Sequence, residues 1–162
     1  MYPHAILLST LLVCANAAFA AQGISWREQD AIGWACGGIG YEERQSLRVL
    51  ESRGNVALLF VSGTRGGLIA DVKLRVVSAK DPGLGLDITV EGPQCIVRLP
   101  AGDWQVQARH GQTLREQTLS VRASQAGAVQ RWQFTFPAEA GDGPRATPEE
   151  ASQVGDWGKV GR

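Results

Sequence analysis

Polar and apolar residues alternate along the chain from Asn55 to Phe136, and this period of two constrains the fold more than any other feature. Successive side chains of a β-strand point to opposite faces, so each alternating segment offers one apolar face to a core. Turn-forming sequences such as Asp81-Pro82-Gly83 separate the segments. Short strands at this spacing predict an all-β fold, a single seven-stranded β-sandwich. The expected strands are Val56–Val61, Asp71–Val76, Leu86–Glu91, Cys95–Leu99, Trp104–Arg109, Thr113–Arg122 and Arg131–Phe136.

A short helix is expected just before these strands. Glu42 and Glu43 stand at its start, Arg48 and Arg53 near its end, and Gly54 follows. Acid in the first turn and base in the last complement the helix dipole, and glycine commonly ends a helix. Residues 21–54 are therefore interpreted as an irregular lead-in with a short helix, and residues 55–137 as the sandwich domain.

Residues 1–20 have the composition of a secretory signal peptide. An apolar run ends at Ala15, and the A-x-A sequence that ends at Ala20 predicts cleavage between Ala20 and Ala21. The run is shorter than the roughly 20 apolar residues that span a bilayer, and no later segment approaches that length. We therefore expect a periplasmic or secreted protein without a transmembrane segment after signal removal. Cys14 leaves open a lipid-anchored protein cleaved before that cysteine.

The last residues, 138–162, have a different composition. They are rich in Gly, Pro, Ala and charged residues and contain few apolar residues apart from Trp157. Such a segment buries too little apolar surface to offset the entropy of ordering, so a disordered tail is expected.

The charges of the chain balance. Sixteen Lys and Arg residues stand against sixteen Asp and Glu residues. Proteins that bind nucleic acids gain affinity from a basic surface that neutralises phosphates. A nucleic-acid partner is therefore not expected.

Two cysteines, Cys36 and Cys95, follow the predicted signal peptide. An even number of cysteines in an oxidising compartment favours pairing, and a bridge here would close a long loop. We predict a Cys36–Cys95 disulfide, with two separate buried thiols as the alternative.

Residues for catalysis or metal binding are few. His110 is the only histidine after the predicted signal peptide, and no nucleophile-elbow motif occurs. Glu42 and Glu43 are neighbours on a helix and diverge by about 100 degrees, which disfavours a joint acid–base role. No catalytic residue, metal or cofactor is assigned.

The aromatic residues fall into two groups. Trp104, Trp132, Phe134 and Phe136 alternate with polar residues, which favours core packing over a ligand groove. Trp26 and Trp34 lie in the expected irregular lead-in. They are the predicted partner surface.

The strand segments resemble the carboxypeptidase regulatory-like, transthyretin-like (prealbumin-like) domain. In that family a strand ends in L-x-x-G before an aromatic residue and an alternating strand, and here Leu99-Pro100-Ala101-Gly102 precedes Trp104. Residues 37–44 also look like the helix-opening stretch of short exported bacterial proteins that carry this domain. The resemblance implies a seven-stranded sandwich used as a scaffold or binding module, and no catalytic residue.

These observations predict a non-enzymatic exported module of the cell envelope. It is expected to bind another envelope protein, through an exposed sheet edge or through the lead-in. The alternative is a small envelope enzyme or inhibitor that acts on peptide or polysaccharide.

Overall fold

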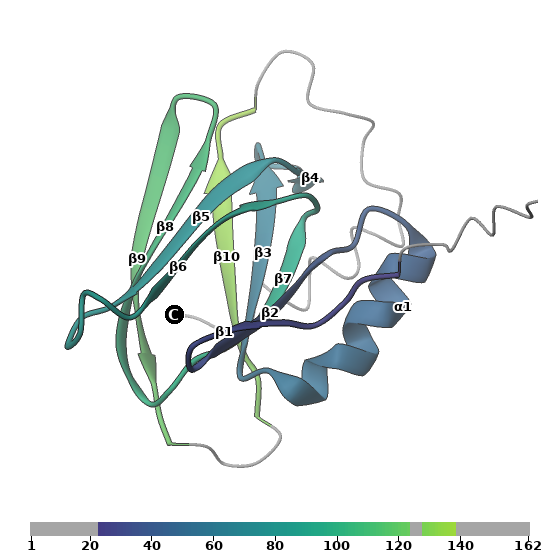
Figure 1. The fold of residues 1–162 in the computed structure, drawn as a ribbon. Coiled ribbons are helices and arrows are strands. Elements are labelled where there is room, and N and C mark those ends of the chain that lie inside the picture. Colours follow the sequence, from purple (N-terminus) through teal and green to yellow (C-terminus); the bar gives the residue numbers. More distant parts are fainter. Residues whose placement is uncertain (1–22, 124–127, 139–162) are drawn as a thin grey trace, which may run out of the picture.

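The computed structural model describes residues 23–123 and 128–138, which form two β-sheets packed face to face and one short helix (Figure 1). The all-β sandwich predicted from the alternation is confirmed at this level. The predicted signal peptide, with Cys14, Ala20 and Ala21, lies outside the described residues, as does the tail from residue 139 onward, with Trp157. No helix in the described part of the chain is long and apolar enough to cross a membrane.

Sheet A has six strands. Along the sheet the order is β1-β2-β7-β3-β10, and β4 pairs with β3. All neighbours are antiparallel except β10 and β3, which run parallel. The bounds are β1 Arg27–Gln29, β2 Ile32–Gly37, β3 Val56–Ser62, β4 Gly67–Leu68, β7 Gln94–Arg98 and β10 Gln130–Phe136.

Sheet B has four antiparallel strands in the order β6-β5-β8-β9. Its outer face is polar, while its inner face supplies half of the core. The bounds are β5 Val72–Ser78, β6 Gly85–Val90, β8 Gly102–His110 and β9 Thr113–Val121.

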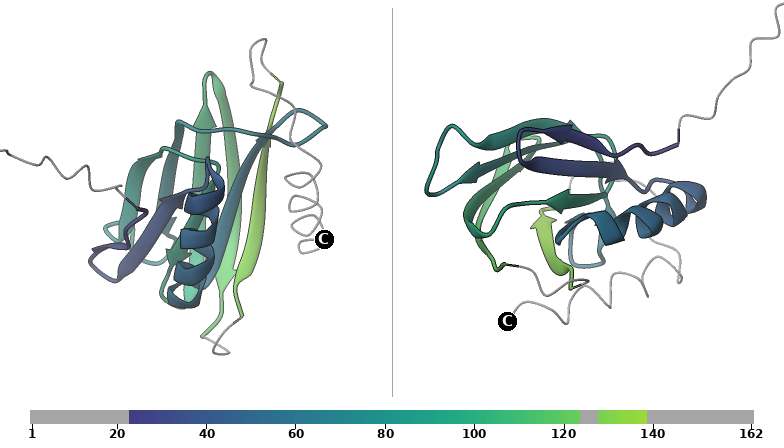
Figure 2. Two further views of the ribbon diagram at one scale, coloured as in Figure 1. Left: turned by 90° about the vertical axis from the view of Figure 1, so that its right-hand side faces the viewer. Right: turned by 60° about the horizontal axis from the view of Figure 1, so that its bottom comes forward.

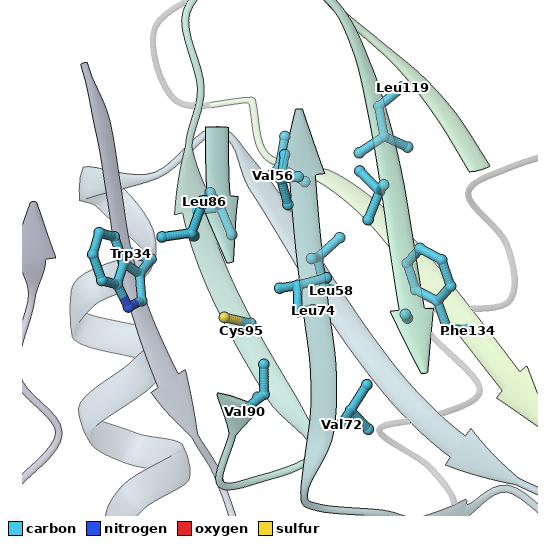
Figure 3. Close-up of a cluster of buried hydrophobic side chains, with 14 of the residues drawn as sticks. Trp34, Val56, Leu58, Val72, Leu74, Leu86, Val90, Cys95, Leu119 and Phe134 are labelled. Atoms are coloured by element: carbon cyan, nitrogen blue, oxygen red, sulfur yellow. The ribbon is translucent and has the colours of Figure 1, made fainter. Parts of the chain in front are cut away.

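The core lies between the sheets and is built from the apolar side of each alternating strand (Figure 3). Trp104, Phe60 and Phe134 are the largest fully buried side chains. Buried tryptophan needs a partner for its N–H, and the Trp104 indole donates to the Pro100 carbonyl at 3.0 Å. The prediction that Trp104, Phe134 and Phe136 pack in the core is confirmed, and Trp132 packs half-buried against it.

Helix α1 (Tyr41–Leu50), continued by one 3-10 turn (Glu51–Arg53), lies against the outer face of sheet A (Figure 2). The helix position predicted from the charge pattern is confirmed. Leu47 is its one buried residue, and it packs on Ala35, Ala57 and Ile96 of the sheet. The helix thus covers part of the sheet's outer face while the remaining helix surface faces solvent.

The lead-in differs from the expectation. Residues 27–37 were expected to be irregular, but they form the β1–β2 hairpin and extend sheet A. With β4 this gives ten strands among the described residues instead of the expected seven. Strand β2 is buried on both faces, so it lacks the alternation that marks a half-buried strand. Strands β1 and β4 are only three and two residues long and carry no readable period.

Candidate functional site

A groove opens on one side of the sandwich, between the β1–β2 hairpin of sheet A and strand β6 of sheet B. Its volume is about 380 Å³. Its lining combines apolar and ionisable side chains. The lining residues are Gly23, Ile24, Ser25, Arg27, Trp34, Cys36, Gly37, Ile39, Glu43, Ile88, Thr89 and Glu91.

Strand β6 is the edge of sheet B along this groove, because it pairs with β5 only. The Ser78 amide donates to the Leu84 carbonyl, and the Ala79 amide donates to the Asp103 carbonyl of the other neighbour. Hydrogen-bonded pairs alternate in an antiparallel ladder. Even-numbered residues of β6 therefore bond to β5, and the backbone groups of Gly85, Asp87 and Thr89 point away from the sheet.

These outward groups are available to a ligand. Within residues 23–123 and 128–138, no hydrogen bond is made to the outward N–H or C=O of Gly85, Asp87 or Thr89. The strand's side chains alternate as well, with Leu86 and Val90 buried and Asp87 and Thr89 exposed. An edge of this kind can accept another strand.

The opposite wall of the groove is held by the predicted disulfide, which the structure contains. Cys36 of β2 and Cys95 of β7 are directly opposed in the sheet, with Cα atoms 4.1 Å apart. Both side chains belong to the core side of sheet A. The bond fixes the end of β2 that lines the groove.

The end of the groove is shaped by the turn before α1. Gly38 has a φ of 96°, a conformation that favours glycine. One carboxylate oxygen of Glu43 accepts hydrogen bonds from the amides of Gly38 and Ile39, at 2.9 and 3.0 Å. Glu43 therefore holds the turn that leaves the Ile39 side chain 63% exposed at the groove.

The two tryptophans of the predicted partner surface do not lie together. Trp34 is 9% exposed and packs in the core between the sheets, with one edge on the groove. Trp26 lies on the other face of sheet A, over Gly33, where an added Cβ would come within 2.5 Å of its ring. Gly33 and Trp34 are adjacent in β2, so they face opposite sides of the sheet. The two residues therefore do not form one surface, and their predicted role in binding a partner stays a prediction.

Trp26 instead belongs to a small ionic cluster outside the groove. The guanidinium groups of Arg53 and Arg98 lie 4.8 and 5.9 Å from its ring centre. Its indole N–H donates to Glu28 at 2.9 Å, and Glu28 also pairs with Arg98 at 3.1 Å. The hydrogen bond from Trp26, followed by the charge of Arg98, lowers the pKa of the Glu28 carboxyl below its ordinary value. This cluster fastens the hairpin to the rest of sheet A.

The other side of the sandwich, between β9 and β10, is closed by side chains. The Arg115 Nε donates to the Thr135 carbonyl at 2.8 Å, and the Gln117 amide donates to the Gln133 carbonyl at 3.4 Å. These bonds occupy outward main-chain oxygens of the edge strand β10. His110, the histidine considered above, ends β8 here and packs edge-on against Phe136.

The sequence did not reveal the edge or the groove. Alternation identified β6 as a strand, and Asp87 and Thr89 as its polar side, but the order of strands in a sheet is not encoded in a local pattern. Comparison with family models, curated proteins and solved structures finds no match for this chain, so its function is argued from its own residues.

Proposed function

We propose that this protein is a non-enzymatic exported binding module of the cell envelope, of the carboxypeptidase regulatory-like type. It engages another envelope protein by taking an extended segment of that protein as an additional strand beside β6. One observation carries this proposal: the unpaired edge of β6 runs along a groove of about 380 Å³.

Main-chain hydrogen bonds to the outward groups of Gly85, Asp87 and Thr89 would supply affinity in this mode, because unpaired strand groups find new partners at such an edge. Side chains of the added strand that point inward would enter the groove, where Trp34 and Ile88 lie. The other edge strands differ from β6. Strand β1 has three residues, and two outward oxygens of β10 are bonded to side chains of β9. Strand β9 is the second edge of sheet B, and β6 is preferred over it because the groove of about 380 Å³ runs beside β6.

Site-specific photo-crosslinking in exporting cells tests the proposal. A photoreactive residue at Asp87 is expected to form adducts with an envelope protein, and Thr89→Pro in the same chain is expected to abolish them. Proline removes the outward N–H of residue 89 and places its ring where the added strand would lie. A photoreactive residue at Glu116, on the far strand of sheet B, is the matched control. Equal adducts from both positions, or adducts that survive Thr89→Pro, would contradict the proposal.

Export is tested separately by the intact mass of the purified protein. A mass that begins at Ala21, with thiols of Cys36 and Cys95 blocked only after reduction, is the expected result. A mass that includes the first twenty residues would contradict export. A lipid on Cys14 would place the module on a membrane surface.

A further inference from the structure

If β6 takes an additional strand, as proposed above, the charges around β6 restrict which side chains that strand can carry. Asp87 of β6 is exposed, and Glu91, the residue that follows the end of this strand, is exposed and lines the groove. Glu43 lines the groove on the side of α1, and Arg27 of β1 is the one basic residue of the lining. The edge therefore presents acidic side chains to an incoming strand.

On the outer face of sheet B, the charged residues of neighbouring strands lie in rows that end at β6. In the row that contains Asp87, the register places Arg75 beside it, then Gln107, then Glu116. The Gln107 amide donates to Glu116 at 2.7 Å. Charges of opposite sign on neighbouring strands stabilise a sheet, and like charges destabilise it. On an added strand, the residue directly opposite Asp87 would therefore be stabilised most if it were basic.

In the neighbouring row, which contains Thr89, a basic residue on the added strand is disfavoured. Thr89 lies beside Lys73, and Lys73 lies beside Arg109. This row already contains two basic side chains, so another one opposite Thr89 would add repulsion. An acidic residue there would lie diagonally opposite Asp87, so the preferred residue is uncharged.

Side chains between these outward positions point into the groove. Residues opposite Ile88 and Val90 face inward, toward Trp34 and the disulfide. Apolar side chains fit this lining. The outward and inward preferences together define a sequence.

We propose that the occupant of this edge is an extended segment of the pattern basic–apolar–uncharged–apolar–basic, with its basic residues paired to Asp87 and Glu91. A second copy of this chain is a poor occupant. A two-fold pairing of two β6 strands centred on Thr89 places Asp87 against Glu91, and one centred on Asp87 places acid against acid.

Peptide binding to the full exported chain tests this assignment. The probe peptide TKVTVKT follows the pattern and reads the same in both directions, so its result does not depend on strand orientation. The peptide TEVTVET reverses only the charges. At low ionic strength, TKVTVKT is expected to bind more tightly than TEVTVET, by about two- to fivefold for each of the two pairs.

Charge reversal on the protein completes the test. Asp87→Lys is expected to weaken TKVTVKT about fivefold and to strengthen TEVTVET by a similar factor. Glu116→Lys makes the same charge change at the far end of the same row, and both peptides are expected to keep their affinity within about twofold. Equal binding of the two peptides, or equal effects of the two variants, would overturn the pattern.

The two proposals fail in different ways. If both peptides bind equally and Thr89→Pro abolishes both, the β6 edge is the site but the charge pattern is wrong. If neither peptide binds, or Thr89→Pro changes nothing, both the edge and the pattern are wrong.

Discussion

At the β9–β10 side of the sandwich, side chains reach across and bond main-chain oxygens, whereas at the side of β6 and the β1–β2 hairpin a groove separates the sheets. Both sides end in edge strands of six or seven residues, β6 and β10. An edge of this length exposes main-chain groups that pair with other chains unless it is covered. Two outward oxygens of β10 are bonded to side chains of β9, whereas no hydrogen bond of the described residues reaches the outward groups of β6.

The difference concerns β6 and β10, and only β6 of these two edge strands runs along the groove. Arg115 and Gln117 use long side chains of β9 to occupy the oxygens of β10. The β6 side has no such bonds among the described residues, and its sheet A wall is held instead by the Cys36–Cys95 disulfide. Side chains therefore bridge the two sheets at the β9–β10 side, whereas the disulfide links two strands of sheet A and leaves the groove beside β6 open.

The largest expected effect follows from removal of that disulfide. In Cys36→Ala/Cys95→Ala the free energy of unfolding is expected to fall by about 4 kcal/mol, because the bond closes a long loop between residues 59 apart in sequence. Urea unfolding gives the change, and amide exchange locates it. Protection is expected to fall more in β2 than in β9. An equal loss of protection in β2 and β9 would contradict the difference between the two sides.

A pair of proline substitutions tests which backbone groups of β6 face outward. Ile88→Pro removes an amide that bonds to β5 and is expected to cost about 3 kcal/mol or more. Thr89→Pro removes an outward amide and is expected to cost within about 1 kcal/mol, as proline does at a free edge. Urea unfolding of both variants measures the difference. Equal destabilisation would show that the outward direction of Thr89 is wrong.

How far the sequence predicts this arrangement differs between the two sides. Alternation located β6, β9 and β10 as strands, and the cysteine count predicted the bond between Cys36 and Cys95. The hairpin that forms one wall of the groove was missed, because β2 is buried on both faces and shows no period of two.

The roles of single side chains were harder to predict. Trp34 and Trp26 look equivalent in the sequence, yet the first lies in the core and the second on the outer face of sheet A. Arg115 lies on the same side of β9 as the buried Leu119 and Val121, and its contact with β10 becomes visible only once β10 is placed beside β9. Such contacts depend on which strands become neighbours, and local patterns do not contain that information.

Removing a hydrogen bond between β9 and β10 should change the free energy of unfolding less. Arg115→Ala is expected to lower the free energy of unfolding by about 1 kcal/mol, since it removes one charged hydrogen bond at an exposed site. It also uncovers the Thr135 carbonyl, so self-association is expected to increase at high protein concentration. Arg109→Ala, on the outer face of sheet B and without a hydrogen bond in the described part of the chain, is the control. Sedimentation of both variants measures their self-association. Equal self-association of the two variants would contradict the prediction.

The smallest expected effect concerns Glu28 on the hairpin. Its pKa is lowered in the folded protein, so its contribution to stability is present above its ordinary pKa of 4.5 and is lost as the pH falls through the folded value. Glu28→Gln is expected to lower Tm slightly at pH 7 and not at pH 3. High salt should shrink the difference at pH 7, because the ion pairs are exposed. A Tm difference that is larger at pH 3 would contradict this reading.

The most direct test of the free edge is a backbone amide NMR titration of the protein with TKVTVKT. We expect the amides of Gly85, Asp87 and Thr89 to shift and to become protected from exchange, while those of β9 and β10 stay unchanged. Shifts confined to β9 and β10, or to the outer face of sheet B away from β6, would contradict the claim that β6 is the edge to which a partner strand adds.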